Sequence, residues 1–191
     1  MSHDAPQPAH PLAEALAEAL TDLRPAHVLL IGAGDGRNLA PFRAHAIVVY
    51  VVPAGGSLAD LTGPFDGVLS THDLLHGTRR AVAARLSQLR ALLAPDGRLY
   101  ATFGSARDPR CGAGDAIGGG DGWAQRAGDE AGIVHAYFDE PGLRAALAGF
   151  TVVSIAERDV TQIAGRWAHA RGDGPVVHWL VEARRTGLRD G

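Results

Sequence analysis

The side chains best suited to chemistry are histidines and a tyrosine in the middle of the chain. His72 and His76 stand four residues apart, and His135 and Tyr137 follow a glycine-rich stretch. An imidazole works well as a general base near neutral pH, so we expect His72 or His135 to supply the catalytic base if the reaction needs one. The expected substrate contacts are His76, Tyr137 and Trp167.

The pair His72 and His76 also has the spacing of two zinc ligands on one helix face. Asp73 then stands where a metalloprotease carries its glutamate. The segment leaves a predicted strand rather than a long helix, and no third ligand stands out in the sequence. We therefore expect no metal site, and we expect His72 to lie at the carboxyl end of a strand, where α/β proteins bind ligands.

A ligand-binding turn is predicted between residues 32 and 36. The apolar run 28–31 predicts a buried strand, and glycines follow at alternate positions, Gly32, Gly34 and Gly36. Backbone N–H groups at such a strand-to-helix turn approach a ligand closely because no Cβ intervenes. The same glycines can form a tight turn that binds nothing, and Asp35 can serve only as a helix cap.

The elements that must position these residues alternate between strands and helices. Apolar periodicity and capping residues predict helices at 11–23, 38–43, 78–93 and 140–148, and strands at 28–31, 46–52, 65–70, 98–103, 151–155 and 176–183. This order predicts a Rossmann-like, doubly wound α/β fold: a mostly parallel sheet with an antiparallel C-terminal edge hairpin. We expect one domain at 11–185, a flexible N-terminus at 1–10 and a tail at 186–191.

Composition argues against several function classes. The 191 residues have a net charge of −3, and the 18 positive residues form no basic block, so we expect no nucleic-acid partner. No apolar run approaches the length of a membrane span, so we expect no membrane partner. Cys111 is the single cysteine, which excludes an intrachain disulfide and favours a reducing compartment. We expect a cytoplasmic protein.

Further motifs follow the glycine turn in a fixed order. They are FDGVLSTHDLLH at 65–76, LLAPDGRL at 92–99, HAYFDE at 135–140 and HWLVEAR at 178–184. Together with the turn, this ordered set resembles the class I S-adenosylmethionine (SAM)-dependent methyltransferases over roughly residues 12–185. The resemblance is closest to short small-molecule methyltransferases of the tellurite-resistance type.

The resemblance implies SAM as cofactor and direct methyl displacement onto a small-molecule acceptor. Catalysis then consists mainly of aligning the nucleophile, methyl group and sulfur and excluding water. The residues that the resemblance assigns to cofactor binding are Gly32, Ala33, Gly34, Asp35, Gly36, Asn38, Tyr50, Asp60, Ser70, Thr71 and His72. The glycine spacing, G-x-G-x-G, disfavours an NAD(P)-linked oxidoreductase, whose fingerprint is G-x-G-x-x-G.

The chain departs from the family pattern at two acidic positions. Leu30 stands two residues before the first glycine, and Tyr50 stands near the end of the second strand, where the family usually has carboxylates. A tyrosine offers one hydroxyl to a ribose instead of two carboxylate oxygens. These departures favour an alternative: a degenerate methyltransferase fold without methyl transfer, acting as a ligand-binding or interaction protein or as a cofactor-free enzyme.

The chain is also short between the second strand and Phe65. Residues 53–64 leave no room for the helix and third strand that the family usually has there, so we expect both to be missing. The strand at 46–52 then becomes an apolar sheet edge, which is prone to association. We expect a homodimer through this edge.

Overall fold

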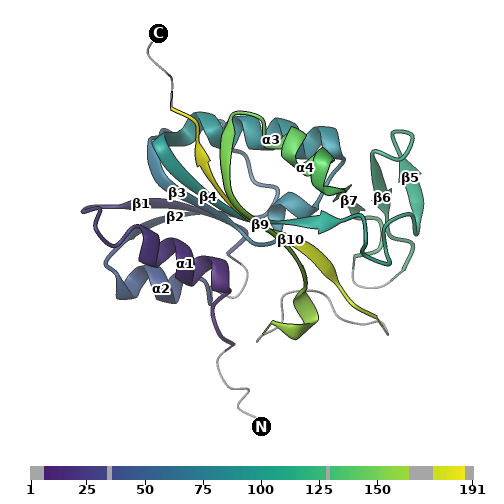
Figure 1. Ribbon diagram of the computed structural model, residues 1–191, viewed down its shortest axis with the longest axis horizontal. Coiled ribbons are helices and arrows are strands. Elements are labelled where there is room, and N and C mark those ends of the chain that lie inside the picture. Colours follow the sequence, from purple (N-terminus) through teal and green to yellow (C-terminus); the bar gives the residue numbers. More distant parts are fainter. Residues whose placement is uncertain (1–6, 34–35, 128–129, 164–173, 188–191) are drawn as a thin grey trace.

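A central, mostly parallel sheet forms the middle layer of the protein (Figure 1). The computed structural model describes residues 7–33, 36–127, 130–163 and 174–187. The strand order is β2-β1-β3-β4-β10-β9, and β8 also pairs with β4. The bounds are β1 His27–Ile31, β2 Val48–Val52, β3 Phe65–Ser70, β4 Leu93–Ser105, β8 Tyr137–Phe138, β9 Phe150–Asp159 and β10 Val177–Arg185. Strands β2, β1, β3 and β4 are parallel, whereas β10 is antiparallel to both β4 and β9, which confirms the predicted fold class.

Helices cover the two faces of this sheet, as Figure 1 shows. Helices α1 (Pro11–Ala19) and α2 (Leu39–Ala44) lie on one face, and α3 (Arg79–Leu92) and α4 (Glu140–Ala146) lie on the other. Neighbouring residues of β1 point to opposite cores: Leu30 packs with α1 and α2, and Leu29 packs with α3 and α4. A parallel strand buried on both faces is apolar throughout, which explains the unbroken run in β1.

Capping residues begin the helices where the sequence predicts. Thr78 Oγ1 accepts the N–H of Ala81 at 3.2 Å, and Asp139 Oδ1 accepts the N–H of Gly142 at 2.9 Å. The first helix ends earlier than predicted, at Ala19 instead of residue 23. Leu23 is 48% exposed, so the last position of the predicted apolar stripe does not reach the core. None of the described helices has the length and apolar character needed to cross a membrane.

Strand β2 lies at the edge of the described sheet, as the short interval after it predicts. Residues 53–64 form turns and irregular backbone. The apolar side chains of β2 are not covered within the chain, because Val48, Tyr50 and Val51 are 41–48% exposed. The pairing with β1 is nevertheless parallel and in register over all five residues.

The glycine-rich segment after β4, for which the sequence analysis predicts no strand, has regular structure. It contains a second, three-stranded antiparallel sheet of β5 (Asp115–Ile117), β6 (Gly122–Ala124) and β7 (Val134–His135). Gly118, Gly119 and Gly120 all have positive φ and make the turn between β5 and β6. Strands of two or three residues are too short to produce a recognisable alternation, which explains why sequence patterns missed them.

Candidate functional site

The glycine turn connects the carboxyl end of β1 to α2. Gly32 has a φ of 71° and donates its N–H to the carbonyl of Val52 at 2.9 Å, while Gly36 has a φ of 81°. Both φ values lie in the left-handed region that favours glycine. Ala33 is half-buried between them, and the predicted cofactor residues Gly34 and Asp35 lie outside the described residues.

Buried polar side chains meet beside this turn. Asn38 donates from Nδ2 to Thr71 Oγ1 at 3.3 Å and accepts the N–H of His10 at 2.9 Å. His72 Nδ1 lies 3.4 Å from the same hydroxyl. The structure thus brings together three of the predicted cofactor residues, Asn38, Thr71 and His72, and adds His10, which the sequence analysis did not identify.

His10 begins α1, and its ring is almost completely buried. Its Nδ1 accepts the N–H of Leu12 at 3.1 Å, as an N-cap does. Burial, reinforced by the nearby His72 and Arg37, lowers the pKa of His10 from 6.5 to about 3. The imidazole is therefore neutral at physiological pH, and it needs to be, because the capping nitrogen must remain an acceptor.

Ser70, at the carboxyl end of β3, is fully buried, and its Oγ has no hydrogen-bond partner among the described residues. A buried hydroxyl without a partner is costly in a packed interior. This predicted cofactor residue therefore has a donor and an acceptor available at the edge where the glycine turn lies.

Two other predicted cofactor residues are placed differently. The ring of Tyr50 lies 5.4 Å from that of Phe65 and 6.1 Å from that of His27, the first residues of β3 and β1. Tyr50 therefore points toward the amino ends of the strands, away from the glycine turn. Asp60 is exposed in the irregular segment after β2, and Leu30 is buried in the core.

The turn after β2 is held in place by Asp73, in the 3-10 turn that follows β3, and by Arg85 of α3. Asp73 accepts the N–H of Gly55 at 2.5 Å through Oδ1 and contacts Arg85 Nε at 3.2 Å through Oδ2. Arg85 also donates to the carbonyl of Gly56 at 2.8 Å. A Cβ placed on Gly32 would lie 3.5 Å from that of Ala54, so this turn lies directly against the glycine motif.

A small cavity of about 20 Å³ opens on the other side of His72. Residues from four separate parts of the chain surround it: His72, Leu75, Gly104, Arg110, Glu130, His135, Ala136, Tyr137 and His178. The expected base residues His72 and His135 and the expected substrate residue Tyr137 all line this cavity. His76 contacts His135 nearby, whereas Trp167 lies outside the described residues.

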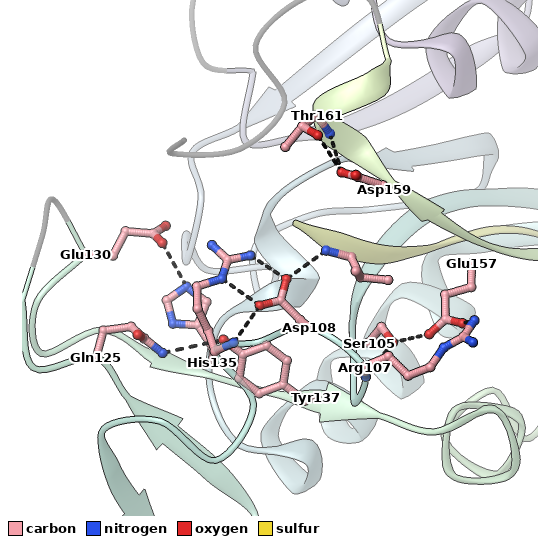
Figure 2. A network of polar contacts seen from close by, with 12 residues as sticks. Ser105, Arg107, Asp108, Gln125, Glu130, His135, Tyr137, Glu157, Asp159 and Thr161 are labelled. Atoms are coloured by element: carbon pink, nitrogen blue, oxygen red, sulfur yellow. Dashed lines mark hydrogen bonds and ion pairs between the residues drawn. The ribbon is translucent and has the colours of Figure 1, made fainter. Parts of the chain in front are cut away.

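Arg110 is fixed beside the cavity by Asp108, which belongs to the network in Figure 2. The guanidinium donates from Nε and NH2 to the two carboxylate oxygens, each at 2.7 Å, and the N–H of Val177 adds a third bond at 2.8 Å. Burial raises the pKa of Asp108, but these hydrogen bonds outweigh it and lower the pKa overall. The positively charged guanidinium of Arg110 is therefore fixed in position beside the cavity. The other charged residue that lines the cavity is Glu130.

Two further cavity residues have strongly shifted pKa values. Burial, with Arg110 close by, lowers the pKa of His178 from 6.5 to about 3. Burial also raises the pKa of Tyr137 above its usual range, and its hydroxyl accepts a 3.5 Å contact from Gln125 (Figure 2). Both groups are neutral at pH 7, so neither is a strong base there.

The cavity residues that the sequence analysis missed come from loops. Glu130 closes the loop before β7, and Arg110 follows β4. The signal available in the sequence was the pair of motifs that contain His135 and His178. No spacing in the sequence connects Glu130 or Arg110 to them.

Comparison with known proteins supports the fold. No family model matches the chain, and no curated protein sequence matches it. Among solved structures, the chain is similar to the 1,6-didemethyltoxoflavin-N1-methyltransferase of Burkholderia thailandensis, solved with bound 1,6-didemethyltoxoflavin and S-adenosylhomocysteine. That match has 24% identity and a TM-score of 0.60 and covers 92% of this chain and 79% of that one.

Two other methyltransferase structures match with similar coverage. The CcbJ methyltransferase from Streptomyces caelestis has 16% identity and a TM-score of 0.60, with 92% of this chain and 94% of that one covered. The magnesium protoporphyrin IX methyltransferase from Synechocystis PCC 6803, solved with SAM, has 17% identity and a TM-score of 0.57, with 91% and 76% covered. At these identities the likeness establishes the fold.

Proposed function

We propose that the protein is a SAM-dependent methyltransferase that acts on a small molecule, with sequence motifs closest to the short tellurite-resistance type. The observation that carries the proposal is the position of the glycine turn. It stands at the carboxyl ends of β1 and β3, next to the buried side chains of Asn38 and Thr71 and the half-buried His72. Ligands of open α/β sheets bind at this edge.

The residues present fit the cofactor at the glycine turn. Gly32 and Gly36 leave the backbone open for close approach, and the buried hydroxyl of Ser70 has no other partner among the described residues. We assign the binding of SAM to residues 32–36 with Asn38, Ser70, Thr71 and His72. When bound, SAM supplies an electrophilic methyl carbon, and the protein residues hold the acceptor in line and exclude water.

His72 is our choice for the general base when the acceptor needs one. It lies between the polar group at the glycine turn and the cavity, so it is within reach of both. His135 lines the same cavity, but its Nδ1 bonds the carbonyl of Ile133 at 3.1 Å and its Nε2 faces Glu130 at 3.3 Å. His76 and Tyr137 remain our candidates for substrate contacts, and Arg110 suits an acceptor that carries negative charge.

Calorimetric titration with SAM and with S-adenosylhomocysteine tests the proposal. We expect micromolar binding at one site per chain, and weaker binding by Gly32→Ala because a side chain at a φ of 71° strains the turn. The matched control is Gly119→Ala, which has a φ of 72° in open space in the β5–β6 turn. Absence of heat and of any thermal shift at millimolar ligand would refute the proposal.

One observation favours a second candidate, a ligand-binding or interaction protein that no longer transfers methyl groups. The carboxyl end of β2 carries Val52 and Pro53 instead of an acidic residue, and the nearby carboxylate of Asp73 already binds Gly55 and Arg85. The ribose hydroxyls of SAM then lack the carboxylate partner that an acidic residue at the end of β2 would supply. Binding of S-adenosylhomocysteine without methyl transfer to any acceptor in a screen would select this candidate.

We also propose that two copies associate through β2 and that the protein acts in the cytoplasm, without nucleic-acid or membrane partners. The support for association is the row of exposed apolar side chains on an edge strand, Val48, Tyr50 and Val51. The single cysteine supports a reducing compartment. A strict monomer at micromolar concentration in light scattering would contradict the dimer.

A further inference from the structure

Two histidines face each other across a short backbone pairing. His76 and His135 form an isolated antiparallel bridge, and the flanking hydrogen bonds are Gly77 N–H to Val134 O at 2.7 Å and Ala136 N–H to Leu75 O at 2.9 Å. Because the bonds flank the pair, it is the closer type of cross-strand pair, with side chains on one face. The two rings accordingly meet edge to face, with centroids 5.0 Å apart.

The carboxylate of Glu130 lies close to both imidazole rings. The loop before β7 turns back through hydrogen bonds from Gly132 N–H to Gln125 O and from Ile133 N–H to Glu130 O. Its carboxylate lies 3.3 Å from His135 Nε2 and 3.6 Å from His76 Nε2, as the close-up of Glu130 and His135 in Figure 2 illustrates. All three ligand atoms lie within 4.8 Å of one another.

The hydrogen bonding of His135 determines what its second nitrogen offers. Nδ1 lies 3.1 Å from the carbonyl oxygen of Ile133, and a carbonyl can only accept, so Nδ1 carries the proton. In the neutral ring Nε2 then presents a lone pair toward a carboxylate that also only accepts. A metal ion bound between this nitrogen and the carboxylate oxygen 3.3 Å away would be coordinated by both atoms. Anchoring Nδ1 on a carbonyl is also how metal-binding histidines are oriented.

We propose that His76, Glu130 and His135 form a binding site for a divalent transition-metal ion, with zinc as the best match. Zinc bonds nitrogen and carboxylate oxygen at about 2.0–2.2 Å, which at a tetrahedral angle puts neighbouring ligand atoms about 3.3–3.5 Å apart. His135 Nε2 lies 3.3 Å from Glu130 Oε2, which agrees with this geometry, and His76 Nε2 lies 3.6 Å from the other carboxylate oxygen, Oε1, which is close to it. His72, the other histidine of the pair that the sequence suggested, is not part of this site, because residues 73–75 form a 3-10 turn and not the long helix that would place both rings on one face.

Three protein ligands leave one coordination position open on a tetrahedral ion. Glu130 and His135 line the cavity together with Arg110 and His72, so an oxygen atom of a ligand in that cavity can complete the coordination. The site stands on its own geometry and does not depend on the proposed methyl transfer. Its test therefore measures the metal and not the reaction.

The experiment uses the full chain without a histidine tag, stripped with a chelator and titrated with Zn²⁺ against a chromophoric competitor. Co²⁺ provides a second probe through the visible absorption of a tetrahedral centre, and Mg²⁺, which prefers oxygen ligands, provides the comparison. The variants are Glu130→Gln and His76→Asn. The matched control is Asp115→Asn, which removes a carboxylate of the same small sheet that forms an exposed ion pair with Arg126.

We expect one equivalent of Zn²⁺ per chain, a Co²⁺ spectrum of tetrahedral type and no competition from Mg²⁺. Loss of a residue that hydrogen-bonds a metal ligand typically weakens metal binding by roughly 10- to 100-fold. Loss of a ligand itself, as in Glu130→Gln or His76→Asn, should weaken Zn²⁺ binding by at least this factor. The control should bind as the unaltered chain does, and circular dichroism should show all three variants folded. Equal Zn²⁺ affinity in Glu130→Gln, His76→Asn and Asp115→Asn, or no stoichiometric binding at all, would overturn the proposal and leave an ion-paired histidine cluster.

Discussion

Acid should destabilise the protein through His10, and the size of the effect follows from its burial. The ring is 1% exposed, and its pKa falls from 6.5 to about 3 on folding because of burial, the nearby His72 and then Arg37. A histidine with a lowered folded pKa stabilises the fold fully above pH 6.5. This contribution is lost as the pH falls from 6.5 toward 3, because only the unfolded chain takes up the proton.

At about pH 5, protonation of this one ring stabilises the unfolded chain relative to the folded chain by about 2 kcal/mol. This value is RT times the natural logarithm of the ratio of protonated to neutral imidazole in the unfolded chain. His178, whose pKa also falls to about 3, adds a similar amount, so the intact chain should lose about 4 kcal/mol between about pH 7.5 and about pH 5. With an m-value of about 2 kcal/mol/M in urea, each histidine shifts the unfolding midpoint by about 1 M.

The variant His10→Asn isolates the contribution of the first helix. Asparagine is among the best N-cap residues and does not titrate, so it keeps the acceptor for the N–H of Leu12. Urea unfolding followed by circular dichroism should give a free energy of unfolding close to that of the unaltered chain at about pH 7.5. On lowering the pH to about 5, the variant should lose about 2 kcal/mol less of this free energy than the unaltered chain does. An acid loss as large as that of the unaltered chain would refute the reasoning.

Three other substitutions test the fold and the surface. Asp108→Asn leaves the partly buried guanidinium of Arg110 without its carboxylate, and urea unfolding should show a loss of about 3 kcal/mol; a change below about 1 kcal/mol would mean that solvent screens the pair. Thr78→Ala removes the cap of α3 and should lower stability by about 1 kcal/mol in the same assay, with exposed Thr151→Ala as the comparison. Val51→Lys places a charge on the exposed edge of β2, and light scattering should show monomers at an unchanged melting temperature; persistence of the dimer would locate the interface elsewhere.

The sequence was sufficient for the main fold because its signals are local. The run in β1 is apolar because both faces are buried, and the caps at Thr78 and Asp139 act within one helical turn. Such patterns depend on the period of the backbone and need no knowledge of distant contacts. The edge position of β2 followed from the short length of chain after it.

The candidate site was predicted less completely because distant segments build it. Asn38, Thr71 and His72 were identified from motif positions, and the structure brings them together. Glu130 reaches His135 only through a loop closed by backbone hydrogen bonds, and His76 reaches it only through the bridge to β7. Tyr50 was assigned by counting along a strand, and counting does not tell which end of the sheet a ring leans toward.

The turn after β2 shows how little chain is needed to support this edge of the sheet. One carboxylate, Asp73, holds the backbone of Gly55 with one oxygen and Arg85 with the other, and Arg85 holds Gly56. Two side chains here support the turn, a role that a whole helix and strand could have in a longer chain. The chain therefore fixes the end of its edge strand with two side chains, and this part of the sheet keeps a defined shape without a further strand beside β2 in the described structure.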